Sequence, residues 1–314
     1  MAGSDDFVSG CFPAVRILVV AAMLITCACC RAGEAAGSDI TLKIGYAGGT
    51  YPDVNNKDVN AAVSVLSRKI AWQNAGKGDA RYYDDIREME KDFREKKLPV
   101  LGLPVETFLK LRTRLPIDPV FISTTDRGYD TELLILVRKD IGIHTVRDLK
   151  NRVIAMPIRN SQYGDLYYTW LETLLMREGF GCRIYSFFSS VKEMRTVSKV
   201  VMPVFFRQAD ACVVSRQVFD LTSDLNPQIG RELTVIARIE HLAQGIVAFD
   251  RRLPDKTRQN FMQAFLTLHE SPEGQQLLML FHVRKLIPFR TEYLKTTEAL
   301  FAEFQKRRAG IARK

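Results

Sequence analysis

The stretch TELLILVRKDIGIHTVRDLKNRVIAM, residues Thr131–Met156, indicates the fold class of this chain. Its first part, Thr131–Arg138, is a nearly continuous apolar run that predicts a strand. A polar turn and a short predicted helix at Thr145–Leu149 follow, and Arg152–Met156 predicts a second strand. Strands that alternate with helices indicate an α/β layer. The sequence on both sides of this stretch continues the same alternation.

The residues before this stretch predict a first α/β unit. Four further strands are expected, and the first three are each followed by a pattern of helical period. The strands are Thr41–Ala47, Asp79–Asp84, Pro99–Pro104 and Pro119–Ser123, and the helices are Asp58–Gln73, Ile86–Lys97 and Val105–Arg112. This order predicts a largely parallel sheet.

The residues after it predict a second α/β unit. We expect strands at Cys182–Phe187, Ala209–Ser215 and Glu232–Arg238, and helices at Asp165–Arg177, Val191–Val200 and Arg216–Asp224. A strand at Gly245–Asp250 and helices at Asp255–His269, Glu273–Phe281 and Glu292–Arg307 complete the chain. No linker rich in Pro or Ser separates the two units. The strands are therefore expected to cross directly between two lobes and to form a hinge.

Composition narrows the class of protein further. The chain has 314 residues, of which 46% are hydrophobic and 26% are charged, as is typical of globular proteins. The net charge is +9, but the basic residues are spread along the chain and no nucleic-acid-binding motif occurs. We therefore expect no nucleic-acid partner, and we interpret the basic tail Gln305–Lys314 as a solvated terminus.

The N-terminus predicts export. Val15–Cys30 is almost entirely apolar, is short for a membrane span, and is followed by small residues in Arg31–Gly37. These are features of the apolar core and the cleavage region of a secretory signal peptide, which we assign to residues 1–36. A lipid anchor is an open alternative because three cysteines lie near the end of this segment, at Cys27, Cys29 and Cys30.

The rest of the chain lacks motifs for catalysis or metal binding. Its only cysteines are Cys182 and Cys212, which in an oxidising compartment either pair or remain two separate buried thiols. None of the four histidines has metal-binding spacing, and no nucleophile elbow, P-loop or dinucleotide motif follows a strand. The sequence thus predicts no metal site, no cofactor and no catalytic residue.

One polar loop is a candidate binding site. Asn160, Ser161, Gln162, Tyr163 and Gly164 lie between a predicted strand and the predicted helix that begins at Asp165. Their hydroxyl and amide groups, together with the free N–H groups of the helix, can hold an anion. The alternative is that these residues only cap the helix.

The order of these motifs resembles the phosphate/phosphonate-type substrate-binding proteins of ABC importers, which have the type II periplasmic binding fold. The resemblance runs from about Leu42 to about Arg290. It includes the D-L-K-x-R-V element at Asp148–Val153 and the S-P-E-G element at Ser271–Gly274. The other segments that carry it are Leu42–Tyr46, Pro99–Phe108, Thr131–Met156, Ala209–Ser215 and Gly245–Leu278.

The resemblance implies two lobes that close on a ligand. Lobe I would comprise residues 38–136 and 240–314, and lobe II residues 137–239. The loop Asn160–Gly164 would hold a phosphate-like or phosphonate-like oxyanion. In this loop Gln162 and Tyr163 replace the small hydroxyl residues of the family. An uncharged or aromatic ligand is the alternative, given Tyr83, Tyr163 and Phe188.

The resemblance also implies further residues of the site. Tyr83 matches a site tyrosine, and Glu106 falls in the wall of the cleft. Ser215 stands where some members use an Asp to bind an ammonium group, so an aminophosphonate would lose that charge partner here.

The expected function is that of a periplasmic, monomeric solute-binding protein that delivers a small molecule to the permease subunits of an ABC importer and is not an enzyme. One alternative is a receptor that presents the same closure to a membrane sensor such as a histidine kinase. The other is an enzyme on the same scaffold, which would need Cys182 or Cys212 as its nucleophile.

Overall fold

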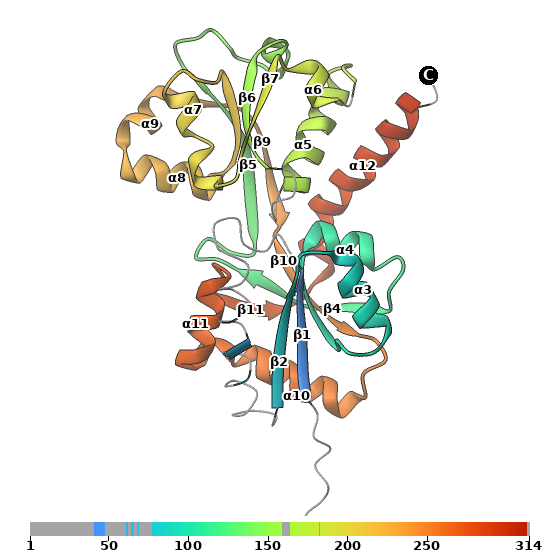
Figure 1. The fold of residues 1–314 in the computed structure, drawn as a ribbon. Coiled ribbons are helices and arrows are strands. Elements are labelled where there is room, and N and C mark those ends of the chain that lie inside the picture. The colour runs from blue at the N-terminus through green and yellow to red at the C-terminus, as the bar shows by residue number, and fades with distance from the viewer. Residues whose placement is uncertain are drawn as a thin grey trace, which may run out of the picture. The chain divides into compact units, whose positions relative to one another are not determined.

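The computed structural model describes residues 41–47, 61, 64–65, 68, 77–158, 164–181 and 183–312. The predicted signal peptide, residues 1–36, lies outside the described residues, as does most of the predicted helix Asp58–Gln73. The described residues form two β-sheets with helices on the faces of each (Figure 1). We call the first sheet with its helices lobe I and the second sheet with its helices lobe II.

The sheet of lobe I has six strands among the described residues, in the order β11-β4-β10-β3-β1-β2. Their bounds are β1 Thr41–Ala47, β2 Lys77–Tyr83, β3 Val100–Pro104, β4 Ile117–Thr124, β10 Gly245–Asp250 and β11 Lys285–Pro288. β1 is parallel to β2 and β3, whereas β10 is antiparallel to both β3 and β4. The sheet is therefore mixed and not largely parallel as predicted, because the chain returns from lobe II and inserts β10 between β3 and β4.

Helices cover both faces of this sheet. They are α3 Ile86–Arg94, α4 Val105–Leu111, α10 Asp255–Leu266 and α11 Pro272–Leu280. α3 is charged over most of its surface, but Met89 and Phe93, four residues apart, are fully buried against the sheet. In β3, Leu101 and Leu103 face this core while Gly102 faces the other side, where a Cβ atom would lie 2.7 Å from the ring of Tyr46.

The sheet of lobe II has the order β7-β6-β8-β5-β9. Its strands are β5 Asp130–Arg138, β6 Val153–Pro157, β7 Ser190–Met194, β8 Ala211–Ser215 and β9 Leu233–Ala243. Its helices are α5 Gly164–Arg177, α6 Ile184–Phe187, α7 Met202–Phe205, α8 Arg216–Leu225 and α9 Pro227–Glu232 (Figure 1). Alternate residues of β5 face opposite cores: Leu133, Ile135 and Val137 pack with α5, and Leu134 and Leu136 pack with α7 and α9.

Two elements of lobe II differ from the prediction. Cys182–Phe187, predicted as a strand, contains the helix α6 instead, because Ile184 and Phe187 are three residues apart and are buried together on one side of a single turn. Val191–Val200, predicted as a helix, begins within the strand β7. Parallel pairing of β7 with β6 overrides the local helical pattern.

The chain crosses between the lobes directly from strand to strand, as predicted. It passes from β4 to β5 through residues 125–129 and returns from β9 to β10 through Gln244. β5 and β9 pair with strands of lobe II over their whole length. If each strand is assigned to the lobe whose sheet it joins, the lobes meet at residues 125–129 and 244. The boundaries expected from the sequence were at residues 136 and 240.

The C-terminal helix completes the fold. The short helix η4, Thr291–Leu294, leads into α12, Lys295–Ala312, which packs against α5 and β9 of lobe II and against α4 of lobe I (Figure 1). No helix in the described part of the chain is both long and apolar enough to span a membrane.

Candidate functional site

The directions of the strands bring the C-terminal edges of both sheets to the crossings. β3 and β4 are both antiparallel to β10, so their C-terminal ends, Pro104 and Thr124, lie at one edge of the lobe I sheet. β5 is antiparallel to β8, so its first residue, Asp130, lies at the edge where β6 and β8 end. The crossing at 125–129 therefore joins the two C-terminal edges. Ligands of α/β proteins bind at such edges.

A pocket of about 240 Å³ lies at these crossings, and we call it the hinge pocket. It takes residues from both crossings and, in lobe II, from β5, β9 and the beginning of α8. Its lining is polar and carries charges of both signs: Thr125, Arg127, Asp130, Thr131, Glu132, Arg216, Gln217, Glu240, His241 and Gln244.

A two-point ion pair in the hinge pocket joins α8 to β5. The Arg216 guanidinium donates from Nε to Glu132 Oε2 at 2.7 Å and from Nη2 to Glu132 Oε1 at 3.2 Å. This fork-to-fork geometry gives both energy and orientation. The side chains are 29% and 17% exposed, so the pair is only partly screened by water.

The other two basic groups of the pocket are also paired. Arg127, in the first crossing, pairs with Asp220 of α8. His241 Nδ1 lies 2.6 Å from Asp130 Oδ2, and this hydrogen bond raises the pKa of the His241 imidazole above its ordinary value. His241 has φ of 59°, in the left-handed region, close to a register shift between β5 and β9. The strained bulge turns its side chain toward Asp130.

Ser215 and Gly164, two of the predicted site residues, lie at the same edge of the lobe II sheet. β6 and β8 are parallel neighbours, with Ile154 opposite Ala211, so both strands end side by side. Tyr167, one turn into α5, is hydrogen-bonded to Ser215, while burial raises the pKa of the Tyr167 phenol to about 12. Asn160, Ser161, Gln162 and Tyr163 lie outside the described residues.

Ser215 has a second role as the N-cap of α8. Its Oγ accepts a hydrogen bond from the Val218 N–H at 3.4 Å. The hydroxyl is therefore engaged by its own helix as well as by Tyr167. The next residue, Arg216, faces the hinge pocket and was not among the predicted site residues.

Glu106 lies close to the second crossing. It is in the first turn of α4 and is only 3% exposed. The N–H of Val105 donates to the carbonyl of Gln244 at 2.9 Å, and Pro104 pairs with Gly245. The start of α4 is thus fixed directly on the crossing residue Gln244.

Tyr83 is held away from the hinge pocket. It ends β2, the edge strand, which β1 and β3 separate from β10 by roughly 14 Å at the usual strand spacing. Its ring is 2% exposed, and its hydroxyl donates to Asp92 Oδ2 of α3 at 2.7 Å. The Tyr83 hydroxyl thus already has a partner in lobe I. A contact between Tyr83 and the ligand remains a prediction.

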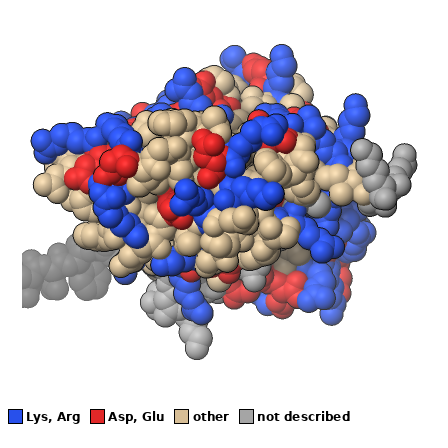
Figure 2. Space-filling view, turned by 90° about the horizontal axis from the view of Figure 1, so that it is seen from above, with Lys and Arg blue, Asp and Glu red and all other residues tan. Residues whose placement is uncertain are grey.

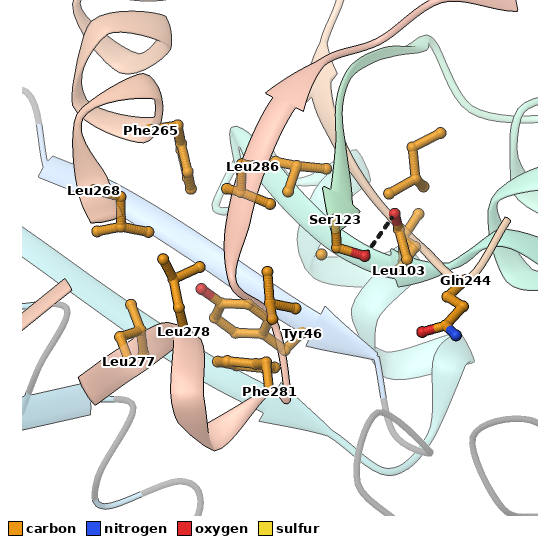
Figure 3. A pocket seen from close by; sticks show the side chains of 15 residues that line it. Tyr46, Leu103, Ser123, Gln244, Phe265, Leu268, Leu277, Leu278, Phe281 and Leu286 are labelled. Atoms are coloured by element: carbon orange, nitrogen blue, oxygen red, sulfur yellow. Dashed lines mark hydrogen bonds between the residues drawn. The ribbon is translucent and has the colours of Figure 1, made fainter. Parts of the chain in front are cut away.

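Lobe I contains a second, apolar pocket (Figure 3). It lies between the sheet and the layer of α10 and α11, and its volume is about 80 Å³. The rings of Tyr46 and Phe281 are 4.6 Å apart in it, and the Ser123 hydroxyl is bound to the carbonyl of Gly245 at 3.1 Å. None of the described residues that line this pocket is charged, so these residues offer no charge partner to an anion.

The described residues show little sign of other kinds of site. Among them, no group of three or more His, Cys, Asp or Glu side chains could hold a metal ion. On the face shown in Figure 2, Lys and Arg side chains are scattered, with Asp and Glu between them. A continuous basic stripe for nucleic acid does not stand out on that face.

A family model described as the periplasmic substrate-binding protein of phosphonate ABC transporters matches residues 49–293. The chain belongs to this family. Members bind a small molecule outside the cytoplasm for an importer, so a small-molecule ligand, permease partners and an extracytoplasmic location follow for this phosphonate-type binding protein. No curated protein sequence matches the chain.

Solved structures confirm the predicted two-lobed type II periplasmic binding fold. XAC2383 from Xanthomonas citri, solved bound to ATP, has a TM-score of 0.63 and 17% identity, covering 86% of this chain and 98% of that one. A binding protein component of a phosphonate ABC transporter from Pseudomonas aeruginosa has a TM-score of 0.60 and 13% identity, covering 86% and 88%. PhnD1 from Prochlorococcus marinus, in complex with methylphosphonate, has a TM-score of 0.59 and 17% identity, covering 85% and 98%.

Proposed function

We propose that this binding protein takes up a small phosphonate-like or phosphate-like oxyanion at the hinge pocket and the adjoining loop Asn160–Gly164. The observation that carries the proposal is the meeting of both C-terminal sheet edges at the crossings, where the hinge pocket lies. A ligand held between these edges contacts both lobes, so its binding energy can drive lobe rotation.

The polar groups at this edge suit an oxyanion. Arg216 directly follows Ser215, and its guanidinium has donors beyond the two that bind Glu132. Thr125 and Gln217 add neutral donors to the same pocket. The loop Asn160–Gly164 leads into the N-terminus of α5, where free N–H groups favour anions. PhnD1, which shares the fold, was solved with methylphosphonate.

The site residues predicted from the sequence differ in how directly they would contact the ligand. Gly164 and Ser215 belong to the lobe II wall, and Glu106 to the lobe I wall beside Gln244. Tyr83 would contribute only if its hydroxyl left Asp92. An uncharged ligand is the alternative occupant of the same pocket.

We also propose that the protein is not an enzyme. Cys212, one of the two candidate nucleophiles, is a free thiol in the middle of β8 with no exposed surface. Burial raises the pKa of this thiol, which disfavours the reactive thiolate. Cys182 lies outside the described residues.

We also propose that the protein is secreted and that it docks on a membrane partner. Residues 1–36 direct secretion, with a lipid anchor as the open alternative, and the mature protein acts as a monomer that docks on permease subunits. A membrane sensor as partner would use the same site and the same rotation. Co-purification of the ligand-bound protein with a permease or with a sensor kinase separates the two.

A thermal-shift titration tests the ligand class. Methylphosphonate, inorganic phosphate, 2-aminoethylphosphonate and methylsulfonate are compared, because a ligand that binds only the folded state raises the melting temperature with concentration. We expect methylphosphonate or phosphate to raise it and Arg216→Gln to move the shift to at least about tenfold higher ligand concentration. The matched control is Arg147→Gln, which removes the surface ion pair with Glu178 within lobe II. No shift with any oxyanion would contradict the proposal.

A further inference from the structure

The C-terminal helix α12 is anchored beside both crossings. Just before it, the ring of Tyr293 stacks 4.3 Å from Tyr129, a residue of the first crossing. In its first turn the buried Thr297 accepts a hydrogen bond at Oγ1 from the N–H of Ala243, the residue before the second crossing, at 3.1 Å. The start of α12 is therefore fixed next to the two points about which the lobes would rotate.

Beyond its first turns, α12 is attached to lobe II. Leu300 is 3% exposed and belongs to the lobe II core, and Phe301 packs against that core. Arg177, the last residue of α5, donates two hydrogen bonds to the Glu303 carboxylate, from Nε to Oε1 at 2.9 Å and from Nη2 to Oε2 at 2.6 Å. Arg307 adds a third bond at 2.7 Å, and these guanidinium groups lower the pKa of the Glu303 carboxyl to about 2.

The contact of α12 with the helices of lobe I is slighter. Glu298 Oε1 lies 2.5 Å from Arg112 Nη1, at the C-terminal end of α4. The side chains of this pair are 41% and 34% exposed, and those of the Arg177–Glu303 pair are 44% and 27% exposed, so the two pairs differ mainly in geometry and in the apolar burial beside the second pair. Exposed single ion pairs contribute little, whereas apolar burial with a two-point Arg–carboxylate contact contributes much more.

We propose that α12 is a third link between the lobes that moves with lobe II, and that the Arg112–Glu298 pair is a latch that opens when the lobes rotate. Glu298 and Glu303 are about 7.5 Å apart along a rigid helix, so one helix cannot follow both lobes. The weaker attachment must give way. Because the latch presupposes the lobe rotation of the proposed function, its test is designed to work without a ligand.

Two matched cross-links distinguish the two attachments. One cysteine pair, Arg112→Cys with Glu298→Cys, joins α12 to α4, and the other, Arg177→Cys with Glu303→Cys, joins α12 to α5. Each is closed with a short methanethiosulfonate cross-linker that dithiothreitol reverses, in a chain whose cysteines other than the buried Cys212 are replaced by serine. Ketone-directed spin labels in place of the exposed Lys91 and Lys199 then report the distance between lobes by double electron–electron resonance.

In the ligand-free protein we expect the α4 cross-link to narrow the distance distribution about twofold, since it ties both lobes to one rigid helix. The α5 cross-link should leave the distribution as it is in the reduced protein. Equal narrowing by both cross-links, or by neither, would overturn the proposal.

Hydrogen exchange supplies a second measurement that needs no cross-link. We expect Arg177→Gln to speed exchange of the α12 amides several-fold, because it loosens the main anchor, and Arg112→Gln to leave them nearly unchanged. The reverse ranking would contradict the assignment of α12 to lobe II. Failure of methylphosphonate and phosphate to bind would count against the proposed function alone, since neither measurement uses them.

Discussion

The hinge pocket and the apolar pocket share Gln244 and otherwise have opposite chemistry. The apolar pocket is built within one lobe, from a sheet and the helices α10 and α11 packed on it. The hinge pocket is lined by lobe II and by the two crossings that lead into lobe I, and it holds paired charges. A pocket within a lobe stabilises that lobe, whereas a pocket at the crossings senses the rotation of the lobes. Mutations in the first should therefore change stability, and mutations in the second should change ligand binding.

The largest expected effect is on stability in the apolar pocket. Phe265 lines it and packs 5.8 Å from the rings of both Phe121 and Phe249. We expect Phe265→Ala to lower the free energy of unfolding by about 3–5 kcal/mol through lost burial and the cavity that remains. Urea denaturation measures this change. The milder variant Phe265→Leu should lose much less stability and keep normal ligand affinity.

The next effect is on binding in the hinge pocket. We expect Arg216→Gln to weaken binding of methylphosphonate or phosphate by tenfold or more, as loss of a charge-assisted contact implies about 1.5–3 kcal/mol. Its effect on stability should be smaller than that of Phe265→Ala, because Arg238 still lies 3.9 Å from Glu132. A variant that unfolded more readily than Phe265→Ala would show that Arg216 is mainly structural.

The smallest expected effect is the pH dependence of stability that the His241–Asp130 pair causes. The Asp130 carboxylate raises the pKa of His241 above 6.5, so the folded state binds this proton more tightly than the unfolded state. The resulting stabilisation is complete below the unfolded pKa and is lost as pH rises through the folded pKa. Nuclear magnetic resonance titration should show the pKa of His241 falling toward 6.5 in Asp130→Asn. An unchanged His241 titration in that variant would show that the pair does not form.

The sequence predicted the architecture well because buried strands and amphipathic helices leave strong local patterns. Thr131–Met156 covers β5 and β6 except for one residue at each outer end, and the strand β8 was predicted as part of Ala209–Ser215. Errors occurred where tertiary contact overrides local pattern, as when β7 pairs with β6 in a segment predicted to be a helix. The insertion of β10 between β3 and β4 is a long-range pairing that no local pattern records.

The candidate site was harder to predict from the sequence than the fold. Ser215 and Glu106 were proposed from the family resemblance and Gly164 from the polar loop, and Ser215 and Glu106 lie near the ends of strands at the crossings. Arg216 was missed, although it directly follows a predicted residue, because its partner Glu132 is distant in sequence. His241 was missed because its meeting with Asp130 depends on a bulge between β5 and β9.

The central claim is that the hinge pocket is the binding site. Its most direct test is calorimetric titration of one ligand into three proteins. The ligand is the oxyanion that gives the largest thermal shift, and the proteins are the wild type, Arg216→Gln and Phe265→Leu. The account predicts that Arg216→Gln loses affinity at least about tenfold while Phe265→Leu stays within about twofold of the wild type. Unchanged affinity in Arg216→Gln together with a large loss in Phe265→Leu would place the ligand in the apolar pocket and contradict it.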